Sequence, residues 1–153
     1  MEHAPSIGLA TPADIPGLCD LLALLFSQEA EFAPDRAASE RGLAAIIADP
    51  ARGHVLVARH NAQPLGMISI LYGISTALGG PVATLEDLVV APGARGAGLG
   101  TRLMEHAIAH ARAQGCLRLT LLTDGDNVDA QRLYKREGFV VSGMVVMRKM
   151  LGE

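Results

Sequence analysis

The chain has 153 residues, half of which are apolar, and its formal net charge at pH 7 is −3. This length predicts a single domain over residues 1–153 with a sizeable core, and the apolar content excludes an intrinsically disordered chain. Aromatic residues make up only 3% and tryptophan is absent, which disfavours base stacking, and the negative net charge argues against nucleic acid or an anionic membrane as the main partner. No apolar run approaches the roughly 20 residues of a membrane span and no signal-peptide pattern opens the chain, which favours a cytoplasmic location.

The first third of the chain predicts one short strand and two helices. Thr11 and Pro12 form a helix start, because threonine caps helices and proline suits the first turn. Apolar residues then recur at helical spacing as far as Gln28, and a loop separates them from a second helical pattern. The expected elements are a strand over residues 7–10, a helix over 12–28, a loop over 29–34 and a helix over 34–48.

The remaining two thirds alternate between strand and helix patterns. Residues 54–59 and 65–72 predict a hairpin, and the apolar stretch 85–90 predicts a buried strand that Pro92 ends. The other expected elements are a helix from 99 to 115, a strand over 117–122, a helix over 128–137 and closing strands over 139–141 and 144–150. This order predicts an α/β (α+β) fold with a mixed sheet, in which strands 85–90 and 117–122 lie parallel.

Glycines crowd the stretch between the strand at 85–90 and the helix that begins at Leu99; they are Gly93, Gly96, Gly98 and Gly100. Glycine lets backbone N–H groups turn outward and approach a ligand closely. A helix N-terminus adds unpaired N–H groups and the positive end of its dipole. The stretch therefore predicts an anion site, since a tight turn without a ligand would need fewer glycines.

Two common phosphate-binding templates do not fit this stretch. The P-loop needs lysine and then serine or threonine after its second glycine, but Leu99 and Gly100 follow Gly98. The dinucleotide template needs glycine where Thr101 stands, and its acidic partner about 20 residues later is missing. Residues 95–100, Arg-Gly-Ala-Gly-Leu-Gly, instead resemble the R/Q-x-x-G-x-G/A signature of the GCN5-related N-acetyltransferase (GNAT) family. In that family the signature cradles the pyrophosphate of acetyl-coenzyme A.

A second stretch carries the same resemblance. Residues 127–139, NVDAQRLYKREGF, match the family pattern N-x-x-A-x-x-x-Y-x-x-x-G-F, and residues 86–92 resemble the family's fourth strand. The resemblance implies a GNAT-like acyl-CoA N-acyltransferase fold with about seven strands and four helices. It also implies an N-acetyltransferase that moves an acetyl group from acetyl-CoA to a primary amine by direct attack in a ternary complex. A non-catalytic acyl-CoA binding or sensing module is the alternative, because the glycine loop alone would serve it.

The resemblance places the coenzyme on the fourth strand, the glycine loop and the last helix. It implies a bulge in the strand, which frees backbone groups beside a site. Arg95 can pair with a phosphate or brace the loop, and Asn127 also suits a helix N-cap. Lys135 and Arg136 are expected to face solvent. The implied coenzyme contacts are Leu88, Val89, Val90, Arg95, Gly96, Ala97, Gly98, Leu99, Gly100, Thr101, Asn127 and Tyr134.

Acetyl transfer to an amine needs a base for the amine and an acid for the departing sulfur. Tyr134 is the candidate acid by resemblance, or else a helix tyrosine that packs on the sheet. Glu86 is the candidate base, through a water, because a buried strand seldom carries carboxylates without a reason. Strict alternation places Glu86 and Asp87 on opposite faces, so only one of them is expected to face the amine. Pairing with an arginine is the alternative for either carboxylate.

The acceptor and the assembly are less well specified. The loop between the first two helices lines the acceptor site in the family, which makes Glu29, Phe32 and Tyr72 the candidate substrate-binding residues. A small-molecule or peptide amine is expected, with its identity open, and similar proteins are commonly homodimers. No metal is expected: His106 and His110 have ligand spacing but are predicted to lie on a solvated helix face.

Overall fold

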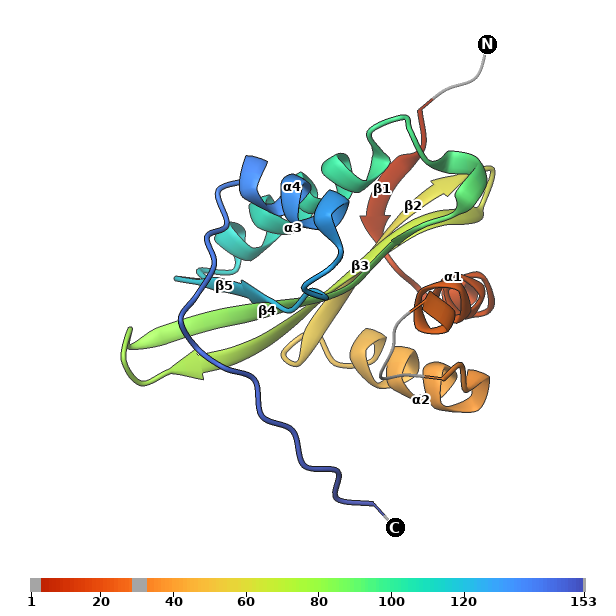
Figure 1. Cartoon of the computed structure of the whole chain (residues 1–153). Coiled ribbons are helices and arrows are strands. Elements are labelled where there is room, and N and C mark those ends of the chain that lie inside the picture. Colours follow the sequence, from red (N-terminus) through yellow and green to blue (C-terminus); the bar gives the residue numbers. More distant parts are fainter. Residues whose placement is uncertain (1–3, 29–32, 153) are drawn as a thin grey trace.

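The computed structural model describes residues 4–28 and 33–152. These residues form a mixed sheet of five strands in the order β1-β2-β3-β4-β5, with helices on both faces (Figure 1). The pairs β1–β2, β2–β3 and β3–β4 are antiparallel, and β5 is parallel to β4 as the chain order predicts. The strands are β1 (Ser6–Leu9), β2 (Gly53–His60), β3 (Gln63–Ser75), β4 (Gly80–Val90) and β5 (Leu119–Leu121). The helices are α1 (Ile15–Gln28), α2 (Arg36–Ile47), α3 (Leu99–Ala113) and α4 (Val128–Arg136), with 3-10 turns at Pro12–Asp14 and Pro92–Ala94.

Polar side chains fix the starts of α1, α2 and α4. The Asp14 carboxylate, in the turn that leads into α1, accepts a hydrogen bond from the Thr11 N–H at 2.8 Å. Asp35 accepts from the Ala38 N–H at 3.1 Å and so caps α2. Each bond satisfies an N–H that the helix itself leaves unpaired. Helix α3 is different, because its N-cap is a glycine without a side chain.

The sheet separates two apolar cores. Helices α1 and α2 cover one face, and α3 and α4 cover the other (Figure 1). Successive residues of β2 alternate between the two cores, as the period of a strand requires. Full burial of a leucine stabilises a fold by about 2 kcal/mol, so these layers hold β4 firmly between them. The α3-side core contains Leu56, Ala58, Ile68, Ile70, Ala83, Leu85, Leu99, Leu103, Met104 and Ala107. The α1-side core contains Leu18, Cys19, Leu21, Leu22, Leu43, Val55, Val57, Met67 and Val89.

The ladder between β3 and β4 is irregular at one place. Met67 pairs with Val89 whereas Ser69 pairs with Glu86, so residues 87 and 88 together oppose Ile68. Asp87 has φ +57° there, in the left-handed region that few residues other than glycine adopt. This arrangement is a β-bulge, the feature that the resemblance implies for this strand.

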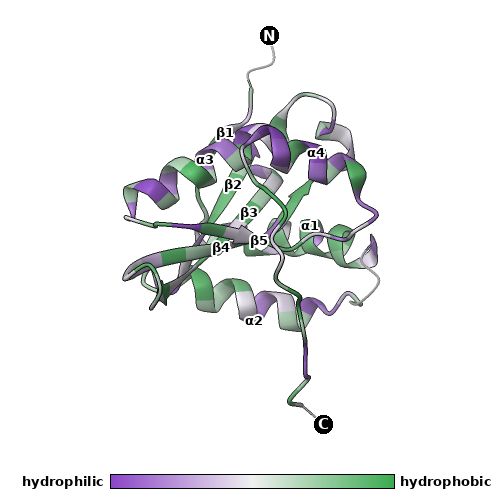
Figure 2. Ribbon diagram, turned by 60° about the vertical axis from the view of Figure 1, so that its left-hand side comes forward, coloured by the Kyte–Doolittle hydropathy of each residue, from purple (hydrophilic) through white to green (hydrophobic). Residues whose placement is uncertain are grey.

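The closing strands expected over residues 139–141 and 144–150 do not form, and the prediction of about seven strands is wrong. After α4 the chain to residue 152 runs without strand pairing and leaves the body of the domain (Figures 1 and 2). Large apolar side chains from Val140 to Leu151 stay exposed, from 58% for Val146 to 92% for Met147. A strand needs a hydrogen-bonding neighbour as well as an apolar pattern, and β5 is short and pairs with β4 alone.

The helices of the described residues are all too short or too polar to cross a membrane. Both cysteines are free; Cys19 is buried in the α1-side core and Cys116 is half-buried. Burial raises the pKa of each thiol, which keeps both in the unreactive protonated form.

Candidate active site

The glycine loop follows β4 and ends in the first turn of α3. Gly96 has φ +85° and Gly98 has φ +76°, and Gly98 is the N-cap of the helix. A Cβ at either position would meet nothing within 4 Å, so crowding does not explain the glycines. The left-handed backbone does, because a side chain is strained in that region. These two glycines of the predicted motif therefore set the shape of the loop.

The backbone N–H groups of residues 96–101 have no hydrogen-bond partner among the described residues. Arg102 is the first residue to donate back into the helix, to the Gly98 carbonyl at 3.0 Å. A helix N-terminus with unpaired N–H groups attracts anions through its dipole and its free donors. The loop thus has the donors that a diphosphate needs.

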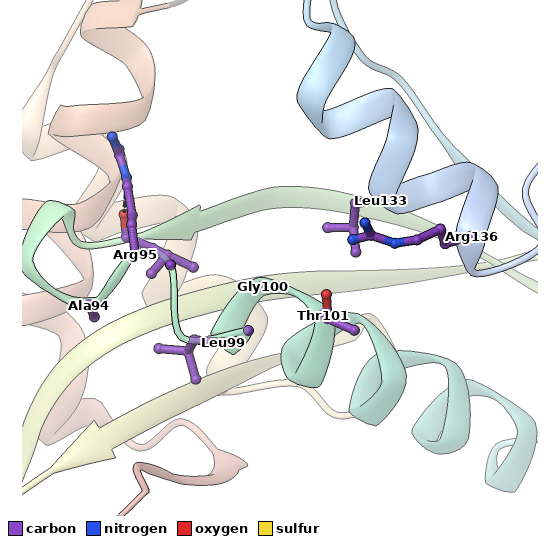
Figure 3. Close-up of a pocket in the computed structure, with 10 residues that line it drawn as sticks. Ala94, Arg95, Leu99, Gly100, Thr101, Leu133 and Arg136 are labelled. Carbon is purple, nitrogen blue, oxygen red and sulfur yellow. Dashed lines mark hydrogen bonds between the residues drawn. The ribbon is translucent and has the colours of Figure 1, made fainter.

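A pocket of about 190 Å³ lies between the glycine loop, the end of β4 and α4 (Figure 3). Helix α4 contributes Leu133 and Arg136, which approach the loop from the other side. Among the residues predicted to contact the coenzyme, those that line this pocket are Val90, Arg95, Gly96, Gly98, Leu99, Gly100 and Thr101.

The other predicted coenzyme residues lie outside the lining of this pocket. Ala97 is an exposed loop residue, and Leu88 packs against the α3-side core. Val89 is buried in the α1-side core, so its side chain points to the opposite face of the sheet. Asn127 accepts a hydrogen bond from the Ala130 N–H at 3.2 Å and therefore caps α4.

Two arginines border the pocket, although only Arg95 was predicted there. Its Nε donates to the Val90 carbonyl at 3.2 Å, which ties the loop to the end of β4. Arg136 is exposed, as the sequence pattern predicts, and it also lines the pocket from α4, which that pattern did not indicate. The signal that was missed is its spacing, because Leu133 and Arg136 are three residues apart and share a helix face.

Tyr134 belongs to α4, and its side chain is half-buried. Its ring packs edge to face against Phe139, with ring centres 6.2 Å apart and an interplanar angle of 69°, and it borders the α3-side core. The tyrosine and the phenylalanine of the predicted motif therefore contact each other. Tyr134 does not line the 190 Å³ pocket.

The bulge changes where the carboxylates of β4 point, and the prediction that Glu86 and Asp87 lie on opposite faces of the sheet is wrong. Leu85 and Leu88 both pack into the α3-side core, which strict alternation forbids for residues three apart. Asp87 lines a pocket on the α1 side, and Glu86 stands opposite Ser69, which lines the same pocket. Directly opposed residues share a face, so Glu86 and Asp87 both project toward α1 and α2.

This second pocket has a volume of about 310 Å³ and lies between α1, α2 and the bulge. The Ser69 side chain at its floor is 1% exposed, and its hydroxyl has no hydrogen-bond partner within the described part of the chain. No sequence signal marks Ser69, because its importance depends on the register of β3 with β4. Two of the predicted acceptor residues, Glu29 and Phe32, lie outside the described residues.

Tyr72, the third predicted acceptor residue, lies on the other face of the sheet. Its hydroxyl is 2.6 Å from His54 Nδ1, and His110 Nε2 is 3.2 Å from the same nitrogen. Burial raises the pKa of Tyr72 to about 12, and burial together with the nearby His110 lowers the pKa of His54. The structure does not bring Tyr72 into the 310 Å³ pocket, and it places His110 against His54 rather than on a freely solvated face.

Comparisons with known proteins agree with this geometry. Residues 16–139 match the Acetyltransferase (GNAT) family. Aminoalkylphosphonate N-acetyltransferase from Salmonella typhimurium is 31% identical over 130 residues, which is 85% of this chain and 81% of that protein. Streptothricin acetyltransferase from Streptomyces lavendulae is 44% identical over 61 residues, but the match covers only 40% of this chain and 32% of that protein. An integron cassette protein from the mobile metagenome of Cole Harbour Salt Marsh superimposes with a TM-score of 0.82 at 27% identity, over 96% of this chain and 91% of that one. Because the family match covers most of the chain and joins the glycine loop to α4, this protein belongs to the acetyltransferase (GNAT) family.

Proposed function

We propose that this protein transfers an acetyl group from acetyl-CoA to a primary amine by direct attack within a ternary complex. Family membership supports the N-acetyltransferase class. One observation supports the donor: unpartnered N–H groups at residues 96–101, beside two left-handed glycines and the start of α3. Such a cluster of donors fits a diphosphate, and Arg95 and Arg136 add positive charge at the same pocket.

Strand β4 links the proposed donor and acceptor pockets. Val90 lines the donor pocket on one side of the sheet, and Asp87 lines the 310 Å³ pocket on the other. Three residues along a strand span about 10 Å. A thioester and an amine held in the two pockets can therefore meet at the bulge, where the backbone of Leu88 and Val90 is proposed to bond the coenzyme arm.

The proposed chemistry needs no covalent enzyme intermediate. Acetyl-CoA supplies a thioester carbonyl; a nitrogen–carbon bond forms, the carbon–sulfur bond breaks and the electron pair leaves with the sulfur. An alkyl ammonium has a pKa near ~10.4, so it must lose a proton before attack. We assign this proton to Glu86 through a water, and the proton for the departing sulfur to the Tyr134 hydroxyl. Asp87, which faces the same side, is the alternative base.

Two measurements test the proposal. Calorimetry is expected to show heat of binding with coenzyme A and none with NAD, and thiol release from acetyl-CoA is expected to depend on added amine. Binding of coenzyme A without thiol release across a broad amine panel would support the non-catalytic acyl-CoA module instead. No binding of coenzyme A at millimolar concentration would overturn both readings.

A further inference from the structure

The 310 Å³ pocket on the α1 side is a built site rather than a packing defect. Its walls are mainly apolar and come from both helices, including Leu22, Phe26, Leu43 and Ile46. Its floor is polar, because Ser69 and Asp87 meet there from neighbouring strands. Ligand sites combine apolar walls with a few placed polar groups in this way, and this volume lies at the small end of their range.

Ser69 indicates that the floor is completed by a ligand. Its hydroxyl is fully buried yet has no hydrogen-bond partner among the described residues. An unmade bond of this kind costs stability, and buried polar groups are almost always satisfied. The hydroxyl belongs to a residue that lines the pocket, so a donor group that enters the pocket can supply the missing bond.

Asp87 supplies the charge at the same place. The bulge holds its backbone at φ +57°, and a non-glycine residue keeps such a conformation only where the surrounding structure imposes it. The result is that Asp87 lines the pocket beside Ser69. A second carboxylate, that of Asp35, lies at the start of α2, where it already accepts from the Ala38 N–H.

The described lining contains two aspartates and no lysine, arginine or histidine. A cationic group is therefore favoured at the floor over an anionic one. The apolar walls in turn suit a hydrocarbon body, because burial of apolar surface stabilises the complex. A small volume disfavours a large polycationic ligand.

Building on the acetyl transfer proposed above, we infer that the acceptor is a small primary amine with an apolar body. Its ammonium group contacts Asp87 and the Ser69 hydroxyl, and its hydrocarbon part lies against Leu22, Phe26, Leu43 and Ile46. Asp87 and Ser69 are thus specificity-determining residues. Glu86, on the same face of β4, takes the proton before the amine attacks.

An amine panel tests the substrate class. Thiol release is measured with acetyl-CoA and either 2-phenylethylamine, hexylamine, 2-aminoethylphosphonate or kanamycin. The two apolar monoamines are expected to have kcat/KM values at least about tenfold above those of the phosphonate and the aminoglycoside. Equal or better turnover of the phosphonate or of kanamycin would overturn the inference and leave the acetyltransferase proposal standing.

Binding to the pocket is measured without turnover, so that its failure differs from failure of the enzymatic proposal. Ligand-observed NMR of 2-phenylethylamine with the free protein is expected to show binding that kanamycin does not displace. Ser69→Ala is expected to weaken it about tenfold, the effect of a lost bond to a charged group. The same change removes an unsatisfied buried hydroxyl, so the melting temperature is expected to stay equal or to rise. Unchanged amine binding in Ser69→Ala would overturn the role of this residue.

A steric variant gives an independent test. Gly42 lines the pocket from α2, and a Cβ there would meet nothing within 4 Å. Gly42→Leu is expected to raise the KM of the apolar amines about tenfold or more, because the side chain occupies part of the pocket. The substitution also replaces a glycine inside α2 by a better helix former, which favours folding. The matched controls are Ala45→Leu, on the same helix but outside the pocket, and Glu105→Gln, on α3. Both are expected to have the wild-type KM. Gly42→Leu with wild-type KM and intact coenzyme binding would show that the amine binds elsewhere.

Discussion

The Arg59 guanidinium holds the Asp14 carboxylate at the start of α1: Nε donates to Oδ1 at 2.9 Å, and a terminal nitrogen donates to Oδ2. Asp14 is almost fully buried, and it also accepts from the Thr11 N–H. The same guanidinium donates to the Leu9 carbonyl at 3.0 Å. One ion pair therefore joins β1, the entry to α1 and β2, and it orients the helix that forms one wall of the 310 Å³ pocket.

Asp14→Asn is expected to lower the free energy of unfolding by about 3 kcal/mol, because it leaves the arginine without its partner. The hydrogen bond from Arg59 holds the pKa of Asp14 below its ordinary value of 3.8. The contribution is then complete above about pH 5 and is lost as the pH falls from the unfolded pKa through the lower folded pKa. Urea denaturation of both proteins at pH 7 and toward pH 2 measures this, and the difference is expected to shrink in acid. Asp129→Asn, in an exposed pair with Arg132, is the control without a measurable effect.

Gly98→Ala tests whether the left-handed backbone of the glycine loop is needed to bind coenzyme A. The new methyl group meets nothing, but φ +76° is strained for alanine, so stability is expected to fall by about 1 kcal/mol. Relief of this strain would rotate the N–H groups of the loop, and the affinity for coenzyme A is expected to fall at least about tenfold. Gly93→Ala is the matched control, since its Cβ also meets nothing and its φ is not left-handed. Isothermal calorimetry measures both variants, and equal affinities would contradict the role assigned to the loop.

Tyr134→Phe tests the proposed acid. The ring and its contact with Phe139 remain, so the melting temperature and the affinity for coenzyme A are expected to stay close to wild type. Turnover is expected to fall about tenfold, at the low end for a general acid, because a thiolate already leaves readily. Single-turnover kinetics with saturating amine separates this step from product release. A variant that turns over at the wild-type rate would remove Tyr134 from the mechanism.

Glu86→Gln tests the proposed base through its pH dependence. Near pH 7 the variant is expected to lose about a hundredfold in kcat/KM, a typical contribution of general-base catalysis. The gap to wild type is expected to close as the pH approaches the amine pKa of about 10.4, because the free amine then forms without help. A pH–rate profile of both proteins gives the result. A constant ratio across the range would assign Glu86 to binding instead of proton transfer.

The sequence predicted the glycine loop and the order of elements well because both depend on local chemistry. Gly96 and Gly98 were expected from their spacing, and both adopt the left-handed backbone that only glycine tolerates easily. The parallel pairing of β5 with β4 followed from the helix between them. Helix boundaries at Gln28 and Leu99 likewise follow from local periodicity and capping.

The failures share a different cause, since they depend on contacts between distant residues. The segment from Val140 to Met150 has apolar runs typical of strands but pairs with none of the described strands, so its large apolar side chains remain exposed. Ser69 and Asp87 meet only because of the bulge, which no period of one strand reveals. Arg136 lines the 190 Å³ pocket because α4 packs beside the glycine loop, an arrangement that the helix pattern alone does not reveal.

The bulge also restricts how this protein can change over time. Residues 87 and 88 share one partner on β3, so the loss of either codon would restore a regular ladder there. Asp87 would then be deleted or would face the α3 side with Ile68, and the 310 Å³ pocket would lose its carboxylate in both cases. Insertions and deletions should therefore be purged from this strand and accumulate at the exposed hairpin tip near Gly79.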